Sequence, residues 1–141
     1  LLSDLGAEII KVEIPGSGDD SRAFGPFLHN RSLYFLSINR GKKSISLNLK
    51  AEKGKQLLKD LAMHCDVIVE NYRPGTMEKL GLGYEVLKEL NPRLIYAAAS
   101  GYGHSGPDSL KPAYDILAQA RGGIMSITGW EDCPPTRVGM S

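Results

Sequence analysis

The chain has 141 residues, a formal net charge of +1, 42% hydrophobic residues and 23% charged residues. These totals are typical of a soluble globular domain with a sizeable core, and the near-neutral charge excludes a broad basic surface for nucleic acid. No apolar run is long enough to span a bilayer. The two distant cysteines predict a reducing compartment, which is the cytoplasm or, in a eukaryote, the mitochondrial matrix.

The first residues predict a helix end, a strand and a loop. Leu1–Gly6 has leucines at near-helical spacing before a glycine, and it has no signal-peptide pattern. It lacks an initiator Met and begins as if midway through a helix, which indicates a piece of a longer chain. Ala7–Glu13 has the apolar content of a strand. Residues 15–26 are rich in Gly, Asp and Ser and predict a loop, whose charged residues are expected to be solvated: Asp19, Asp20 and Arg22.

The middle of the chain predicts strand, helix and strand. Leu33–Ile38 is apolar but ambiguous in type, whereas Ser44–Leu49 alternates as a strand does. Ala51–His64 has leucines on one face and lysines on the other, which predicts an amphipathic helix. Val67–Val69 is β-branched throughout and predicts a strand buried on both faces, ending at Glu70-Asn71-Tyr72-Arg73.

The remaining elements complete an alternating pattern. They are short helices around Met77–Leu80 and Tyr84–Leu90, a strand at Leu94–Ser100 and a helix at Tyr114–Arg121. Strands that alternate with helices predict crossover units and a mainly parallel sheet, and therefore an α/β fold.

A parallel sheet would bring several loops together at the carboxyl ends of its strands, where open α/β sheets bind ligands. Near this edge the sequence places cations, an aromatic ring and an amide: Lys11, Lys50, Arg73, Lys79, Tyr72 and Asn71. This chemistry suits a phosphorylated ligand, although an ordinary polar loop would have the same composition.

Other candidate sites are weaker. Ser105 lies in Gly103–Gly106, which resembles a nucleophile elbow but has its second glycine one residue too early. Asp115 is explained as an acid at a helix start, and it could also point into a site. The three histidines lack metal-ligand spacing, so no metal is expected.

Seven short motifs occur along the chain: Asp4–Glu13, Asn39–Ser44, Asp66–Gly75, Gly81–Tyr84, Asn91–Tyr96, Ser100–Gly103 and Ser105–Pro107. In content and order they resemble the family III CoA-transferases (CaiB/BaiF type), such as the formyl-CoA and succinyl-CoA:dicarboxylate transferases. The resemblance implies a Rossmann-like, mainly parallel sheet with flanking helices, as an internal part of the large domain of an interlocked homodimer. Residues 1–141 would then be a partial CoA-binding large domain, lacking an N-terminal strand and the C-terminal remainder.

The resemblance also implies a reaction. Family members move CoA between carboxylic acids. An active-site aspartate attacks the acyl-CoA, and an enzyme-bound CoA thioester forms by way of mixed anhydrides, which is covalent catalysis by a carboxylate. The nucleophilic Asp is expected just beyond Ser141. No residue of this chain is therefore assigned as catalytic, and residues 1–141 alone are expected to be inactive.

The family's binding residues carry over by position. The implied CoA contacts are Leu47, Lys50, Asn71, Tyr72, Arg73 and Lys79, and the implied substrate-side residues are Tyr114 and Asp115. Lys79 stands where many members have Arg, so it keeps the charge without the planar fork. Ile14 stands where some members carry a CoA-binding Arg.

Two other functions stay open. The related α-methylacyl-CoA racemases tend to carry His-Asp where this chain has Tyr114-Asp115, and tyrosine is a poor general base near neutral pH, which favours the transferase. The third hypothesis is a non-catalytic CoA-binding fragment. The expected partners are an acyl-CoA and a small carboxylic acid, with neither nucleic acid nor membrane.

Overall fold

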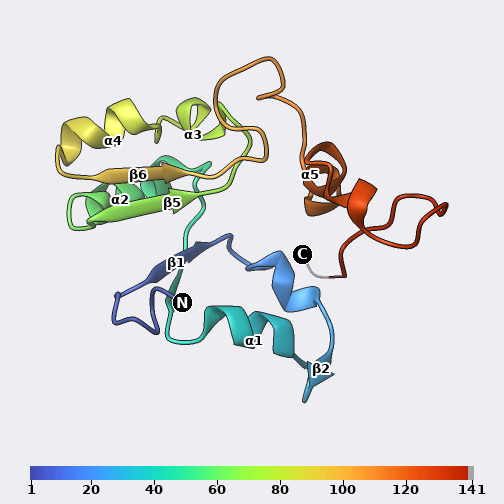
Figure 1. Ribbon diagram of the computed structural model, residues 1–141. Helices are drawn as coiled ribbons and strands as arrows, with labels where there is room; N and C mark the ends of the chain where they lie inside the picture. The colour runs from blue at the N-terminus through green and yellow to red at the C-terminus, as the bar shows by residue number, and fades with distance from the viewer. Residues whose placement is uncertain (140–141) are drawn as a thin grey trace. The chain divides into compact units, whose positions relative to one another are not determined.

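The computed structural model describes residues 1–139 and divides into two units, Leu1–His64 and Cys65–Ser141. Figure 1 shows the elements of both units in chain order. The first unit contains β1 (Ile10–Glu13), η1 (Asp20–Ala23), β2 (Phe27–Leu28), β3 (Arg31–Ser32), α1 (Leu33–Asn39), β4 (Lys43–Ser46) and α2 (Glu52–Ala62). The second unit contains β5 (Val67–Glu70), α3 (Thr76–Lys79), α4 (Tyr84–Leu90), β6 (Ile95–Ala98), α5 (Asp115–Arg121) and η2 (Ile124–Ile127).

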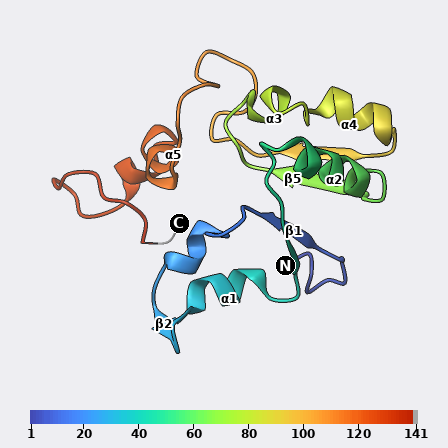
Figure 2. The same cartoon turned by 180° about the vertical axis from the view of Figure 1, so that it is seen from behind.

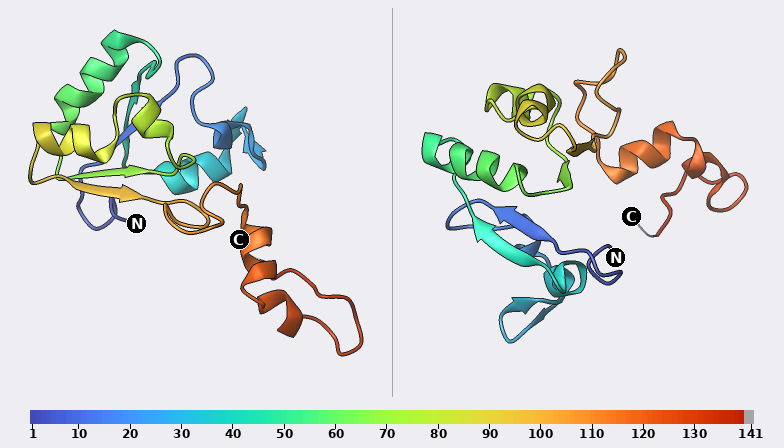
Figure 3. Two further views of the ribbon diagram at one scale, coloured as in Figure 1. Left: turned by 90° about the horizontal axis from the view of Figure 1, so that it is seen from above. Right: turned by 90° about the vertical axis from the view of Figure 1, so that its left-hand side faces the viewer.

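The first unit is built on a parallel pair of strands. β1 pairs with β4 from Ile10 opposite Lys43 to Glu13 opposite Ser46, and the two arrows run side by side in Figure 3. The backbone N–H of Leu47 continues the ladder by donating to the Glu13 carbonyl at 3.0 Å. The segments after Glu13 and after Ser46 therefore leave the sheet at the same edge.

The helices of the first unit form where local chemistry favours them. The ambiguous stretch Leu33–Ile38 lies in α1, whose start is capped by the Ser32 hydroxyl accepting from the Phe35 N–H at 3.0 Å. The amphipathic pattern of Ala51–His64 is confirmed by α2, which buries Gly54, Leu58 and Ala62 on one face.

The second unit repeats the parallel arrangement. β5 pairs with β6 from Val67 opposite Ile95 to Glu70 opposite Ala98. The helices α3 and α4 lie along one face of this pair in Figures 1 and 2. The buried apolar side chains of this unit are Met77, Leu82, Leu87 and Leu94. The α/β class with parallel strands and flanking helices is therefore confirmed.

Two predictions of local structure are wrong. Leu1–Gly6 forms turns instead of a helix, because a segment this short has no buried apolar face to stabilise helical hydrogen bonds. The strand Val67–Val69 exists, but its two valines are 47% and 67% exposed. Within residues 1–139, β6 is the strand that pairs with β5. A strand is buried on both faces only when a layer of helices or strands covers each face of its sheet.

The predicted parallel strands form two separate two-stranded sheets in the described part of the chain, beside the antiparallel pair β2–β3. Across residues 1–139, no helix combines the length and the apolar character needed to cross a membrane.

Candidate functional site

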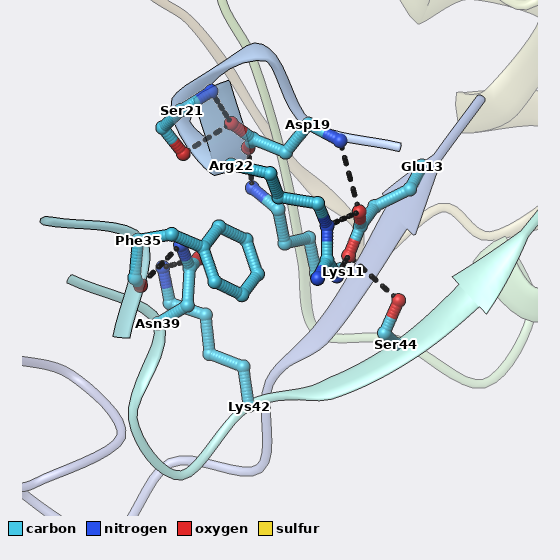
Figure 4. Close-up of polar contacts among 9 residues, drawn as sticks. All are labelled: Lys11, Glu13, Asp19, Ser21, Arg22, Phe35, Asn39, Lys42 and Ser44. Atoms are coloured by element: carbon cyan, nitrogen blue, oxygen red, sulfur yellow. Dashed lines mark hydrogen bonds and ion pairs between the residues drawn. The ribbon is translucent and has the colours of Figure 1, made fainter. Parts of the chain in front are cut away.

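Glu13 lies at the end of β1, and the residue is only 7% exposed. Its Oε2 accepts hydrogen bonds from Arg22 Nε and from the Asp19 backbone N–H, each at 3.0 Å, and its Oε1 accepts from Arg22 Nη2 at 3.0 Å. The Ser44 hydroxyl of β4 donates to the same Oε1 at 2.8 Å. Figure 4 shows how these donors converge on one carboxylate. Hydrogen bonding, above all from the Arg22 guanidinium, lowers the pKa of Glu13 to about 2.

Asp19 continues this network. Its carboxylate pairs with Lys11 Nζ of β1, caps η1 by accepting from the Ser21 N–H at 2.7 Å, and also accepts from the Ser21 hydroxyl. Hydrogen bonds from Lys11 and Ser21 lower the pKa of Asp19 to about 2. The prediction of a solvated loop is wrong for Asp19, which is half-buried because the loop folds back onto β1 (Figure 4). Arg22 is exposed as predicted, although it also pairs with Glu13.

The loop between Glu13 and Asp19 is tightly closed. The Gly18 N–H donates to the Ile14 carbonyl at 3.1 Å, and Gly18 has a φ of +68°. A Cβ at Gly18 would lie 2.8 Å from Glu13 Oε2 and 2.9 Å from Arg22 Nε, so only glycine fits without a shift.

Two hollows flank the ion pair. One of about 320 Å³ lies between the loop residues 14–18 and the β4 residues Ser44 and Ser46. Another of about 130 Å³ is lined by Lys11, Phe35, Asn39 and Lys42 together with the ion pair. The Arg22 guanidinium carbon lies 3.9 Å from the centroid of the Phe35 ring, in cation–π geometry.

Leu47 and Lys50 occupy the turn that joins β4 to α2, in the first unit. Leu47 is buried, whereas Lys50 is exposed. The Asn48 side-chain oxygen accepts from the Lys50 N–H at 3.0 Å, and the Asn48 carbonyl accepts from the Ala51 N–H at 3.0 Å. The turn therefore has a fixed backbone while the lysine side chain faces solvent.

Asn71, Tyr72 and Arg73 follow β5 directly and are exposed. Their backbone is held by the buried Glu70, whose Oε2 accepts from the Tyr72 N–H at 2.7 Å. The Tyr96 hydroxyl of β6 donates to Glu70 Oε1 at 3.4 Å. Burial, and then the nearby Glu70 carboxylate, raise the pKa of Tyr96 above its ordinary value. Tyr96 is therefore a neutral hydrogen-bond donor at physiological pH.

The loop after β6 connects this edge to α5. Gly101 approaches Ala113 so closely that a Cβ on the glycine would lie 2.0 Å from the Ala113 Cβ. Tyr114 and Asp115 follow at the start of α5, and both are exposed. Asp115 Oδ2 accepts from Gln119 Nε2 at 2.5 Å within the helix. Its position in the first turn confirms the reading of Asp115 as a helix-start acid.

Further contacts of the second unit fix this loop. The Arg121 guanidinium lies 5.0 Å from the centroid of the Tyr102 ring and also pairs with Asp108. Lys79 ends α3 and is exposed. Within residues 1–139, no group of three or more His, Cys, Asp or Glu side chains is arranged to hold a metal ion.

The structure thus places the eight predicted site residues in two groups. Leu47 and Lys50 belong to the first unit, and the other six belong to the second. Asn71–Arg73 and the loop that precedes Tyr114 leave the same edge of the β5–β6 pair. The role of each residue in binding CoA stays a prediction. The sequence did not reveal the partners of Glu13. The residues of β1, IKVE, give no sign of which arginine in the following loop will pair with the glutamate.

Comparison with known families decides what kind of chain this is. The sequence profile described as "CoA-transferase family III" matches residues 1–141. This chain belongs to CoA-transferase family III. Among curated relatives, the family III chain is 53% identical over 139 residues to the acetyl-CoA:oxalate CoA-transferase of Acetobacter aceti. It is 52% identical over 141 residues to the succinyl-CoA:glutarate CoA-transferases of Mus musculus and Homo sapiens.

Solved structures agree with this assignment. A CaiB/BaiF family protein from Brucella suis superimposes on the family III chain with a TM-score of 0.92, at 43% identity over 99% of this chain. That match covers 38% of the Brucella protein, and the curated matches cover 36% of the Acetobacter protein and 32% of the mouse and human proteins. The family III chain therefore spans about a third of the length of these relatives.

Proposed function

We propose that this chain is the CoA-binding part of an acyl-CoA:carboxylate CoA-transferase. The observation that carries the proposal is the match to CoA-transferase family III along residues 1–141, together with relatives above 50% identity that are named as CoA-transferases. In the proposed reaction, an aspartate beyond Ser141 attacks the acyl-CoA, which gives a mixed anhydride and releases the CoA thiolate. The thiolate attacks the aspartyl carbonyl of the anhydride and expels the donor acid, which leaves an aspartyl-CoA thioester. The second carboxylic acid attacks this thioester, and through a second mixed anhydride it takes up the CoA and regenerates the aspartate. The chain itself would supply binding and orientation.

We assign the CoA contacts to Leu47, Lys50, Asn71, Tyr72, Arg73 and Lys79. Lys50, Arg73 and Lys79 are exposed cations, which suit the phosphates of CoA. Tyr72 is 46% exposed and offers a ring face for stacking, and the neighbouring Asn71 offers directional hydrogen bonds. The hydrogen bond from the Tyr72 N–H to Glu70 supports this assignment, because it fixes the backbone from which these side chains project.

Tyr114 and Asp115 are assigned to the side of the site that meets the acid. They are exposed at the start of α5, and Ala113 before them lies against Gly101 in the loop after β6. The proposed protein acts on an acyl-CoA and a small carboxylic acid as an interlocked homodimer in the cytoplasm, or in the mitochondrial matrix of a eukaryote, without a metal.

The decisive experiment measures CoA transfer by the full-length protein from acyl-CoA donors to free carboxylic acids. Succinyl-CoA and acetyl-CoA with glutarate and oxalate are the first pairs to test, since they cover the substrates in the relatives' names. We expect thioester exchange and no isotope exchange at the carbon next to the thioester. Isotope exchange without transfer would instead establish the racemase.

The binding residues are tested by calorimetric titration with CoA. Lys50→Ala and Asn71→Ala should each raise the Kd of CoA about five- to tenfold, because each removes a polar contact worth on the order of 1 kcal/mol. Lys53→Ala is the matched control, since Lys53 is an exposed lysine on α2 outside the assigned contacts. An unchanged Kd in the Lys50→Ala, Asn71→Ala double variant would remove the site assignment.

A further inference from the structure

The segment from Glu13 to Arg22 has a feature that the CoA contacts do not explain. It leaves β1, closes a loop, and returns to its own starting residue, since Asp19 N–H and Arg22 both bond the Glu13 carboxylate. Glu13 thus links the two ends of the loop (Figure 4). The bidentate pairing with Arg22 fixes direction as well as distance, because both oxygens are engaged by one planar guanidinium.

The same residue also bonds the turn that carries Lys50. The Glu13 carbonyl accepts from the Leu47 N–H at 3.0 Å, and the Glu13 side chain accepts from Ser44 of β4 at 2.8 Å. The loop 14–18 and the Leu47–Lys50 turn therefore share Glu13 as a common anchor. Between the loop and β4 lies the hollow of about 320 Å³.

We infer that Glu13 and Arg22 are a positioning pair, which holds the loop 14–18 and the Leu47–Lys50 turn as one preformed surface for the CoA portion of the acyl-CoA. This inference rests on the proposed function for the identity of the ligand. Neither residue contacts substrate in this scheme. The pair keeps the loop in its binding conformation before the ligand arrives, so that less ordering entropy is lost on binding.

Gly18 provides an independent test of the same geometry. A side chain at this position would push directly on Glu13 Oε2 and Arg22 Nε. Gly18→Ala should therefore disturb the ion pair without removing either of its charges. Gly6 is its matched control, because it also has a positive φ, of +98°, but a Cβ there would meet no atom within 4 Å.

The experiment uses the full-length protein and compares Arg22→Ala, Arg22→Lys and Gly18→Ala. For Arg22→Ala we expect the Kd of CoA and the KM for acyl-CoA to rise about tenfold, with kcat and the KM for the acceptor acid within about twofold of wild type. Arg22→Lys should retain part of the affinity for CoA, because lysine keeps the positive charge but cannot donate the two parallel hydrogen bonds of the guanidinium. Gly18→Ala should raise the same two constants, and Gly6→Ala should not.

Arg40→Ala is the control for loss of an arginine. Arg40 pairs with Asp4 at 2.8 Å on the surface of the same unit and is not part of the loop, so its loss should leave the Kd of CoA unchanged. A purely structural role for Arg22 would lower the active fraction and apparent kcat while leaving KM and Kd constant. That result overturns the inference. The inference is also overturned if both single variants, Arg22→Lys and Gly18→Ala, bind CoA with the Kd of the wild type.

The two proposals fail in different ways. If the wild-type protein binds CoA but transfers it to no acid, the proposed function fails, and the Kd values of the variants still decide the inference. If the wild-type protein transfers CoA and the variants bind it normally, only the inference fails. If the wild-type protein does not bind CoA, both fail.

Discussion

Glu13 shows how a charged residue is accommodated in a buried position. A buried carboxylate costs several kcal/mol in lost hydration unless it is paired and hydrogen-bonded. Here Arg22, Ser44 and the Asp19 N–H supply donors to both oxygens. Arg22 is half exposed and also stacks on Phe35, so its side chain is held by contacts on two sides.

The hydrogen bonds to Glu13 predict that the folded protein loses stability at acidic pH. The folded protein holds the pKa of Glu13 at about 2, below its ordinary value of 4.5. A depressed pKa means that the unfolded chain binds the proton first, so the stabilisation is fully present above pH 4.5 and is lost as the pH falls towards 2. Asp19 adds a contribution of the same sign, since its pKa is also held at about 2, below 3.8.

We expect Glu13→Gln to lower the free energy of unfolding at pH 7 by about 2 kcal/mol, the typical cost of losing charge-assisted hydrogen bonds at a buried group. It should also flatten the loss of stability between pH 4.5 and 2, because Gln does not titrate. Urea unfolding at a series of pH values measures both effects. Glu131→Gln, at an exposed position, is the control. Parallel pH profiles for wild type and Glu13→Gln would contradict the assignment.

At the scale of elements, the close approach of α2 to the turn before it depends on one glycine. Gly54 is buried in the first turns of α2, and a Cβ there would lie 2.1 Å from the Asn48 carbonyl oxygen. That oxygen already accepts from the Ala51 N–H. The Leu47–Lys50 turn can therefore lie against the helix only because position 54 has no side chain.

Gly54→Ala should destabilise the protein by more than about 2 kcal/mol, even though alanine in a helix interior is normally favoured over glycine by about 1 kcal/mol. The clash between the alanine Cβ and the Asn48 carbonyl oxygen makes the change in the free energy of unfolding destabilising. Chemical denaturation measures the change, and Lys53→Ala on the same helix should stay within about 0.5 kcal/mol of wild type. A more stable Gly54→Ala variant would show that the helix and the turn are further apart than described.

At the scale of the whole molecule, apolar side chains are exposed in quantity. Val69 and Ile95 of the β5–β6 pair are 67% and 61% exposed, and Trp130 is 85% exposed. The chain also spans only about a third of its relatives' length. Large exposed apolar side chains in this number are typical of surfaces that another segment or subunit covers.

We expect residues 1–141 expressed alone to show no CoA transfer, because the proposed nucleophilic aspartate lies beyond Ser141. The isolated segment should also bind a hydrophobic dye such as ANS more strongly, per residue, than the full-length protein does. Circular dichroism is the control for folding of the segment. Robust turnover by residues 1–141 would overturn the placement of the nucleophile.

The sequence by itself determined which segments are helices and strands wherever the apolar pattern or the β-branched content was clear. α2, α4, β5 and β6 lie where their patterns predicted, since spacing along the chain is set by backbone geometry that every residue shares. The seven motifs also led to the family, which the profile match confirms. Local pattern failed at Leu1–Gly6, where the leucines are exposed and no buried apolar face stabilises a helix.

Only the tertiary structure decided which charged residues are partners. Arg22, Asp19 and Ser44 reach Glu13 from a loop and from a neighbouring strand, and such meetings depend on how the chain turns between them. The exposure of β5 could not be predicted from its sequence either, because the apolar run Val67–Val69 predicts a strand whether or not another layer covers it. Periodicity records the shape of one element, whereas burial and ion pairing are properties of several elements in contact.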